Sequence, residues 1–271
     1  MTPGWTLPRQ IEVLKRLYAE QVAYVAKNPR AGLPAENAVD GFEFMSYLHH
    51  KFSLDIIIER EIRIVDMVTP YVRGRVLDWG CHHGHAACLL RMRLGDAVDL
   101  YGCDVFNEDA YRPFYQYSGL AYRRLTHAYR LEYDNAFFDV VLSNGVLEHV
   151  PHECESLQEI GRIIKPGGFF VITALPNRYS YTEAAARLRG MGHERLYSVS
   201  ALTRTLSKHG FRVIRSRYFF AMPTMLLGFP KKVRDAYSRA HQLVRVCNAA
   251  LEVLWPLNRL SSNLMVVAER L

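Results

Sequence analysis

Short apolar runs typical of strands alternate with helical segments from residue 75 to residue 219 of this 271-residue chain. Phe169–Ala174 is continuous and β-branched, as is typical of a strand buried on both faces. Strands that alternate with helices predict parallel βαβ units and a doubly wound α/β sheet. The expected strands are Arg75–Asp78, Val98–Asp104, Leu120–His127, Phe138–Ser143, Phe169–Ala174, Phe211–Phe219 and Asn263–Ala268.

Helical additions flank this alternating core. Apolar residues recur at helical spacing in Ile11–Lys27 and in Phe42–Val68, which predicts a helical cap over residues 1–70. The core then covers residues 71–220 and 263–271. Residues 221–262 form a helical insert between the sixth and seventh strands. At this length, we expect the three parts to form one structural domain.

Two acidic residues stand at the ends of the first two strands. Asp78 is followed by a turn with Gly80 and Gly84 and then by a helix, whose first N–H groups are free to face a ligand. The spacing is Gly-x3-Gly rather than the G-x-G-x-x-G of dinucleotide enzymes, which weakens a phosphate-binding interpretation. Asp104 ends the second strand, where its carboxylate can accept hydrogen bonds from ribose hydroxyls or cap the next helix.

A third motif begins with Phe138-Asp139 and runs through Val146-Leu147-Glu148-His149-Val150. It is followed by Leu157-x-Glu159-x-x-Arg162-Ile163-Ile164-Lys165-Pro166-Gly167-Gly168. With the glycine turn and the acidic end of the second strand, these motifs resemble class I S-adenosylmethionine-dependent methyltransferases, in the branch that acts on small molecules, quinones, lipids and sugars. The resemblance covers residues 75–174. It implies a Rossmann-like, seven-stranded mixed sheet and S-adenosyl-L-methionine as cofactor.

The resemblance also implies roles for the matching positions. Those near the first two strands would hold the methionine and ribose parts of the cofactor, and Ser143 and Asn144 would lie beside its amino-acid part or the substrate entrance. His82 stands where the family usually has glycine. His127 and Ala128 stand where the family often has an acidic residue for the adenine amino group. The implied cofactor-binding residues are Asp78, Gly80, Cys81, Gly84, Asp104, Val105, His127, Ala128, Ser143 and Asn144.

Histidines near the expected substrate side are the candidate catalysts. Methyl transfer to a hydroxyl benefits from a general base, and an imidazole suits that task near neutral pH. His149 follows the fourth strand and is the first candidate, and His193 after the fifth strand is the second. Glu148 could orient His149 or bind a metal. We expect no metal site, because the five cysteines include no CxxC pair and a metal at His82–His85 would compete with the cofactor.

The net charge of +7 fits an ordinary basic enzyme or one attracted to an anionic partner. No nucleic-acid module accompanies the charge, so we expect no nucleic-acid partner. The insert combines Met, Leu and Phe residues with a basic stretch, a pattern that can lie on an anionic membrane surface or pack as a helical pair on the sheet. Residues 1–10 lack a secretory signal, and we expect a cytoplasmic enzyme with this peripheral membrane contact as an option.

The leading functional hypothesis is methyl transfer to a hydroxyl of a small-molecule acceptor, such as a glycan, a lipid-linked compound or an aromatic natural product. N-methylation of a small molecule and a non-catalytic cofactor-binding module are alternatives. An NAD-dependent oxidoreductase is a weaker alternative because the G-x-G-x-x-G turn is missing. The sequence indicates neither the acceptor nor the oligomeric state.

Overall fold

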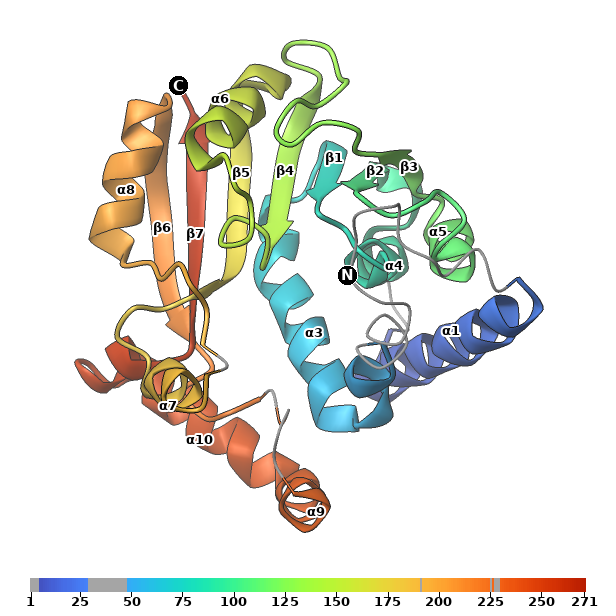
Figure 1. The fold of residues 1–271 in the computed structure, drawn as a ribbon, viewed down its shortest axis with the longest axis vertical. Coiled ribbons are helices and arrows are strands. Elements are labelled where there is room, and N and C mark those ends of the chain that lie inside the picture. Colours follow the sequence, from blue (N-terminus) through green and yellow to red (C-terminus); the bar gives the residue numbers. More distant parts are fainter. Residues whose placement is uncertain (1–4, 29–47, 191, 225, 227–229) are drawn as a thin grey trace. The chain divides into compact units, whose positions relative to one another are not determined.

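The computed structural model describes residues 5–28, 48–190, 192–224, 226 and 230–271. Its strands form one seven-stranded mixed sheet in the order β3-β2-β1-β4-β5-β7-β6, with helices around it (Figure 1). The expected α/β, Rossmann-like fold is therefore confirmed. The strands are β1 Gly74–Trp79, β2 Val98–Asp104, β3 Ala121–Arg124, β4 Phe138–Asn144, β5 Ile164–Pro176, β6 Phe211–Phe219 and β7 Asn263–Arg270.

The chain divides into two compact units, and the first comprises Met1–His127 with Phe138–Val141. In this unit β1 pairs with β2 and β2 with β3, all parallel, and Asp78 is in register with Gly102. The edge of β1 is held by Asp139, whose Oδ2 accepts a hydrogen bond from the Arg75 amide at 2.9 Å. The helices of this unit are α1 Leu7–Lys27, α3 Asp55–Val68, α4 His85–Leu94 and α5 Arg112–Ser118.

The helical N-terminal segment is interrupted where one continuous helix was expected. Residues 48–53 are helical, Leu54 has an extended backbone with φ of −125°, and α3 starts at Asp55. Residues 42–47 of the expected helix lie outside the described residues. Along α3 the isoleucines and Val65 are buried, as the helical spacing predicts, together with the carboxylate of Glu61.

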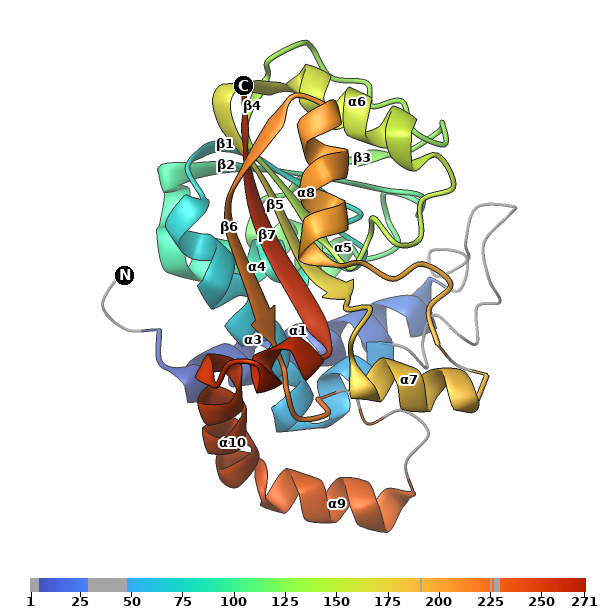
Figure 2. The ribbon, with the colours of Figure 1, turned by 90° about the vertical axis from the view of Figure 1, so that its left-hand side faces the viewer.

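The second unit comprises Ala128–Phe137 and Leu142–Leu271. Its strand β7 is antiparallel to both β5 and β6. Helix α8 runs alongside β6, whereas α7, α9 and α10 gather near the end of β6 that leads into the insert (Figures 1 and 2). The helices of this unit are α6 Glu153–Ile163, α7 Tyr181–Leu188, α8 Val199–Lys208, α9 Lys231–Arg239 and α10 His241–Val253.

Several element boundaries differ from the sequence-based expectations. β3 ends at Arg124, three residues early, so His127 lies beyond it. β5 begins at Ile164, before its expected start at Phe169, and so includes Lys165–Gly168. The helix ends before this stretch, because Ile164 already has an extended backbone and Pro166 disfavours helical backbone angles at Lys165. Helix α7 follows β5 and was not among the helices expected from the sequence.

The insert contains the expected helices, α9 and α10, followed by a short 3-10 helix at Leu257–Leu260. Met225, Leu227 and Phe229, which belong to its apolar beginning, lie outside the described residues. Among the described helices, none has the length and apolar character required to span a membrane.

Candidate active site

The turn after β1 in the first unit brings the backbone close to β2. The Gly80 and Cys81 amides both donate to the carbonyl of Cys103, at 2.9 and 3.2 Å. Gly80 and Gly84 have φ of +70° and +72°, the left-handed region that glycine adopts without strain. A Cβ on Gly84 would also lie 3.0 Å from the ring of Tyr115. The two glycines predicted from the sequence are thus required by the turn.

His82 also occupies the left-handed region, with φ of +47°. Its ring packs on Phe106 and Tyr111, with centroids 4.8 and 5.0 Å apart. Its Nδ1 lies 2.9 Å from Nδ1 of His83. Burial, with smaller contributions from nearby positive groups, lowers the pKa of His82 to about 3, so the imidazole is neutral. The extra side chain is therefore accommodated among the unit's own aromatic residues.

Asp104 is tied to the same turn through both carboxylate oxygens. Oδ2 accepts from the His82 amide and Oδ1 from the Val105 amide, each at 2.7 Å. Burial raises the pKa of Asp104, and these two backbone hydrogen bonds oppose the rise. A carboxylate can accept about four hydrogen bonds, so Asp104 retains capacity for a ligand's hydroxyl groups.

Asp78 is the second carboxyl group of this region and is buried, with only 5% of the residue exposed. Burial, and then the charge of Asp104, raises the pKa of Asp78 to about 7. The buried Asp78 and the half-buried Asp104 are costly to ionise together unless a cation compensates them. These residues therefore suit a ligand that carries positive charge and vicinal hydroxyls.

The remaining residues predicted to bind the cofactor have different surroundings. Val105, His127 and Ala128 are exposed. After β3 ends, the chain makes one more hydrogen bond to β2, in which the Leu125 amide donates to the Asp104 carbonyl at 2.7 Å. The adenine contact through His127 and Ala128 stays a prediction.

Ser143 and Asn144 belong to the second unit, at the end of β4. Ser143 is fully buried, and its Oγ has no hydrogen-bond partner within the described part of the chain. Asn144 Oδ1 accepts from Thr173 Oγ1 at 3.2 Å, and Gly145, with φ of +68°, donates its amide to the Thr173 carbonyl at 3.0 Å. The turn that follows β4 is thereby fixed to β5.

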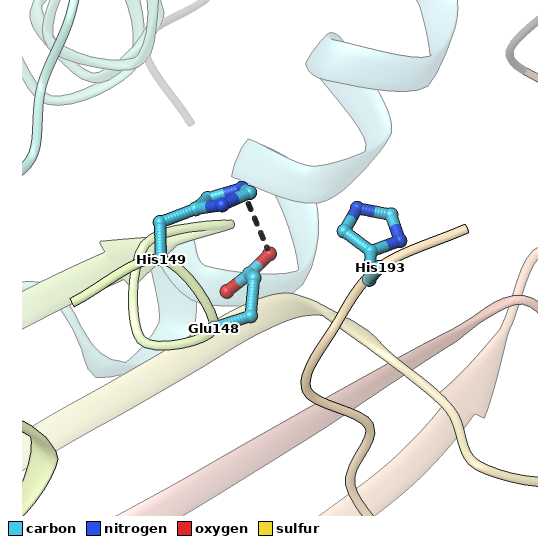
Figure 3. A group of neighbouring side chains, drawn as sticks. All are labelled: Glu148, His149 and His193. Carbon is cyan, nitrogen blue, oxygen red and sulfur yellow. Dashed lines mark ion pairs between the residues drawn. The ribbon is translucent and has the colours of Figure 1, made fainter. Parts of the chain in front are cut away.

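This turn leads to three side chains that gather in the second unit, the Glu148–His149–His193 cluster (Figure 3). One nitrogen or oxygen atom from each lies within 4.8 Å of the others. His149 Nε2 is 3.9 Å from Glu148 Oε1, which is longer than a hydrogen bond. Glu148 does not orient His149 at this distance. The structure brings together the two candidate bases, which are far apart in the sequence.

Glu148 and His149 differ in burial, which gives them different protonation behaviour. The Glu148 side chain is 3% exposed, and its Oε2 has no hydrogen-bond partner among the described residues. Burial raises the pKa of Glu148 to about 7. The His149 side chain is 66% exposed, and partial burial, followed by His193 and Arg195, lowers its pKa. His149 is therefore an accessible and mostly neutral imidazole at pH 7.

His193 is oriented by Glu183, a residue that the sequence analysis did not identify. Its Nδ1 lies 2.9 Å from Glu183 Oε2, and its amide also donates to Glu183 Oε1. Figure 3 shows the other ring nitrogen turned toward Glu148 and His149. A carboxylate on one ring nitrogen fixes the tautomer and leaves the other able to accept a proton.

Arg195 joins the two segments that carry the histidines, and it too was missed. Its Nη1 donates to the carbonyls of Leu147 and Val150, at 3.0 Å each. The Tyr197 hydroxyl adds a hydrogen bond to the Leu147 carbonyl at 3.2 Å. An acidic residue in the first turn of a helix, such as Glu183 in α7, is a weak sequence signal for a helix start. The helix itself was not expected, so this signal did not identify Glu183. Arg195 carried no sequence signal, because the carbonyls of residues 147 and 150 that it binds are backbone atoms, which every residue has.

The same cluster has a donor set that transition metals use. Two imidazoles and one carboxylate form three-residue sites for Zn²⁺ and related ions, with positions left open for substrate. Such a site needs Glu148 ionised and the facing nitrogens of both histidines neutral. The chain thus presents these groups either as proton acceptors or as ligands.

The sequence profile of a family described as "Methyltransferase domain" matches residues 15–216. The chain belongs to the class I S-adenosylmethionine-dependent methyltransferases. S-Adenosyl-L-methionine is the cofactor of this family. The carboxyl groups of the buried Asp78 and the half-buried Asp104 suit its positive charges and its ribose. The membership predicted from the strand-end motifs is confirmed.

Curated relatives match part of the methyltransferase. It is 34% identical over 119 residues to the ubiquinone biosynthesis O-methyltransferase of Maricaulis maris (strain MCS10). This match covers 43% of this chain and 46% of that protein. It is 28% identical over 138 residues to a probable S-adenosylmethionine-dependent methyltransferase of Mycolicibacterium smegmatis (strain ATCC 700084 / mc(2)155), covering 51% and 52%. The matched region spans about half the length of these relatives.

A solved structure supports the fold of the methyltransferase. The S-adenosylmethionine-dependent methyltransferase from Archaeoglobus fulgidus superposes with a TM-score of 0.54 over 78% of this chain and 94% of that one, at 22% identity. At this identity the likeness concerns the fold alone.

Proposed function

We propose that the protein transfers a methyl group from S-adenosylmethionine to a hydroxyl of a small-molecule acceptor, such as a glycan, a lipid-linked compound or an aromatic natural product. The observation that carries the proposal is the accessible, neutral His149 in the Glu148–His149–His193 cluster. A general base matters for a hydroxyl of high pKa, which must lose its proton as the methyl group is transferred. The Maricaulis relative named as an O-methyltransferase supports the same direction.

Bound S-adenosylmethionine supplies a methyl group on a sulfonium centre, which leaves the protein the tasks of orientation and proton removal. We assign cofactor binding to Asp78 and Asp104, with the carboxylate of Asp104 accepting from the ribose hydroxyls. The neighbouring turn residues Gly80, Cys81 and Gly84 offer backbone, and Ser143 and Asn144 offer polar groups after β4.

Proton removal falls to His149 in this proposal. Its lowered pKa keeps the imidazole unprotonated at neutral pH, and its exposure lets an acceptor hydroxyl reach Nε2. His193 is the second candidate base, because Glu183 holds its Nδ1 and the other ring nitrogen is turned into the cluster. Glu148 is the buried member of the cluster, and its pKa is about 7.

Acceptor recognition falls to the segment 177–197 and to the insert. The Tyr181 hydroxyl donates to the Ala221 carbonyl at 2.8 Å, which ties α7 to the beginning of the insert. The Tyr237 hydroxyl donates to the Pro223 carbonyl at 2.6 Å, which ties α9 to the same stretch. Tyr179 is 51% exposed, and its ring can stack on a sugar or an aromatic acceptor.

The test measures release of S-adenosylhomocysteine with three acceptor sets, namely sugars and glycolipids, phenols, and primary or secondary amines. Turnover with a hydroxyl set but not with amines supports the proposal. Turnover with amines alone would replace it by N-methylation. Calorimetry with S-adenosylmethionine, S-adenosylhomocysteine and NAD accompanies the assay. Cofactor binding without turnover on any set would indicate a non-catalytic module.

A further inference from the structure

Helix α10 is amphipathic in the reverse of the usual sense. The residues that face the protein are Val244, Asn248 and Glu252, at spacings of four. The exposed side carries Leu243, Val246 and Val253, which are 65%, 63% and 74% exposed. A helix of a monomeric protein ordinarily buries its apolar stripe and exposes its polar one.

Hydrogen bonds hold the polar side of α10 against the end of β6. Glu252 accepts from Arg217 Nη2 at 3.0 Å and from the Phe220 amide at 2.8 Å. Asn248 Oδ1 accepts from the Met222 amide at 2.7 Å. These bonds fix the rotation of the helix about its axis, so the outward direction of the apolar stripe is built into the fold.

The apolar surface continues beyond the helix. Leu254 and Trp255 follow α10 and are 50% and 77% exposed, and the 3-10 helix adds Leu257 and Leu260, at 48% and 45%. A tryptophan this exposed is unusual on a protein surface that faces water, because large aromatic rings usually bury most of their area. We call α10 with Leu254–Leu260 the α10 face.

The segment around the α10 face is basic. Residues 230–262 contain six lysines and arginines, namely Lys231, Lys232, Arg234, Arg239, Arg245 and Arg259. The acidic residues of this stretch are Asp235 and Glu252, and Glu252 is buried and paired with Arg217. Lys231, Lys232, Arg239, Arg245 and Arg259 are all exposed. The charge presented to a partner is therefore strongly positive.

We propose that the α10 face and the adjoining lysines and arginines of α9 dock the protein on the surface of a membrane rich in anionic lipid. Leucine, valine and tryptophan side chains enter the boundary between headgroups and acyl chains, and basic side chains bind the phosphates. The combination favours lipid over an apolar protein partner, because both the hydrophobic and the electrostatic part match an anionic bilayer. Docking itself does not depend on the proposed chemistry. Its consequence, access to a lipid-linked acceptor, rests on the proposed function.

The experiment is co-sedimentation of the full chain with two kinds of vesicle, phosphatidylcholine alone and an equal mixture of phosphatidylcholine and phosphatidylglycerol. We expect binding to the anionic vesicles, weakened by added salt, and little binding to the neutral ones. The Leu243→Gln/Val246→Gln variant should bind about tenfold more weakly, because two exposed apolar side chains no longer enter the bilayer. Replacing Lys231 and Lys232 by Glu should weaken binding by at least about fivefold for each lysine lost.

Leu188→Gln is the matched control, because Leu188 is 91% exposed at the end of α7 and does not belong to the α10 face. It should bind the anionic vesicles as the natural chain does. Quenching of Trp255 by brominated lipid, absent in Trp255→Phe, gives a direct reading of insertion. Since the altered side chains are exposed, thermal melts of these variants should match that of the natural chain.

Two results would overturn the proposal. One is equal binding of the natural chain and the Leu243→Gln/Val246→Gln variant, or no binding at all. The other is a dimer in light scattering that this variant converts to a monomer, which would assign the face to a second copy. Methyl transfer to a water-soluble acceptor is measured in parallel without vesicles. Vesicle binding without any methyl transfer would reject the proposed function and leave docking intact, and the converse would reject docking alone.

Discussion

Ionisation of Asp78 should make cofactor binding depend on pH in a narrow window. With a pKa of about 7 in the free protein, this carboxyl group is mostly neutral at pH 6 and half ionised at pH 7. S-Adenosylmethionine carries a permanent sulfonium charge and an ammonium group, so it binds the ionised form more tightly and lowers the pKa of Asp78. The ionised fraction rises from about 9% to about 50%, so the affinity should rise about fivefold between pH 6 and pH 7.

Isothermal titration calorimetry in phosphate and in Tris measures both the affinity and the protons released. At pH 7 we expect release of roughly half a proton for each cofactor bound, since about half of the Asp78 groups carry one. Methylthioadenosine is the matched control, because it retains the ribose and adenine but lacks both cationic groups. Its affinity should change less over this window. An affinity for S-adenosylmethionine that is constant from pH 6 to pH 7, or uptake of protons on binding, would refute the reasoning.

The Asp78→Asn variant separates binding from stability. In the folded protein the pKa of Asp78 lies about 3 units above its ordinary value of 3.8, so the free energy of unfolding falls as pH rises from about 4 to about 7. Asn carries no charge at any pH, so the variant should be more stable than the natural chain at pH 8, by up to about 4 kcal/mol. It should also bind S-adenosylmethionine more weakly and without the pH dependence. A variant less stable than the natural chain at pH 8 would contradict this account.

His149→Ala should lower kcat about a hundredfold with little change in cofactor affinity. The turnover of the natural chain should be half-maximal at a pH below 6.5, because burial lowers the pKa of His149 from this ordinary value. An unchanged kcat would remove the base assignment. If His149 acts as a base without a metal, dialysis against EDTA should leave turnover unchanged, whereas a loss restored by Zn²⁺ would show that the cluster binds an ion. Glu252→Ala should lower the free energy of unfolding by about 2–3 kcal/mol in urea titrations, because it removes the buried carboxylate that accepts the hydrogen bond of the Phe220 amide. Glu269→Ala, which removes a partner of a largely exposed ion pair, should cost less than about 1 kcal/mol.

The donor side of the site could be predicted because it depends on local sequence. Asp78 and Asp104 end buried strands whose apolar pattern fixes their positions, and Gly80 and Gly84 mark the turn between β1 and α4. Strand and helix order followed from the same periodicity. Boundaries were less predictable where a strand stops being paired, as at Arg124.

The histidine cluster was predictable only in part. His149 and His193 were each identified as a candidate, but their proximity depends on Arg195 and on an unpredicted helix that supplies Glu183. The orientation of α10 was equally hidden. Its periodicity predicts a helix, but the buried side is determined by hydrogen bonds that Glu252 and Asn248 accept from the backbone amides of residues 220 and 222, respectively.

The contacts of Arg195 have a consequence for how the acceptor side of this protein can diversify. The guanidinium binds the carbonyl oxygens of residues 147 and 150, which every amino acid possesses. The half-buried side chain at position 150 can therefore be exchanged to suit another acceptor while the two histidines stay together. Leu147 is fully buried, so packing constrains its side chain. Arg195 itself has less freedom, because its Nη1 donates both hydrogen bonds and only a long side chain that ends in such a donor reaches both carbonyls. Variation around the cluster should be wide at position 150 and narrow at Leu147 and Arg195.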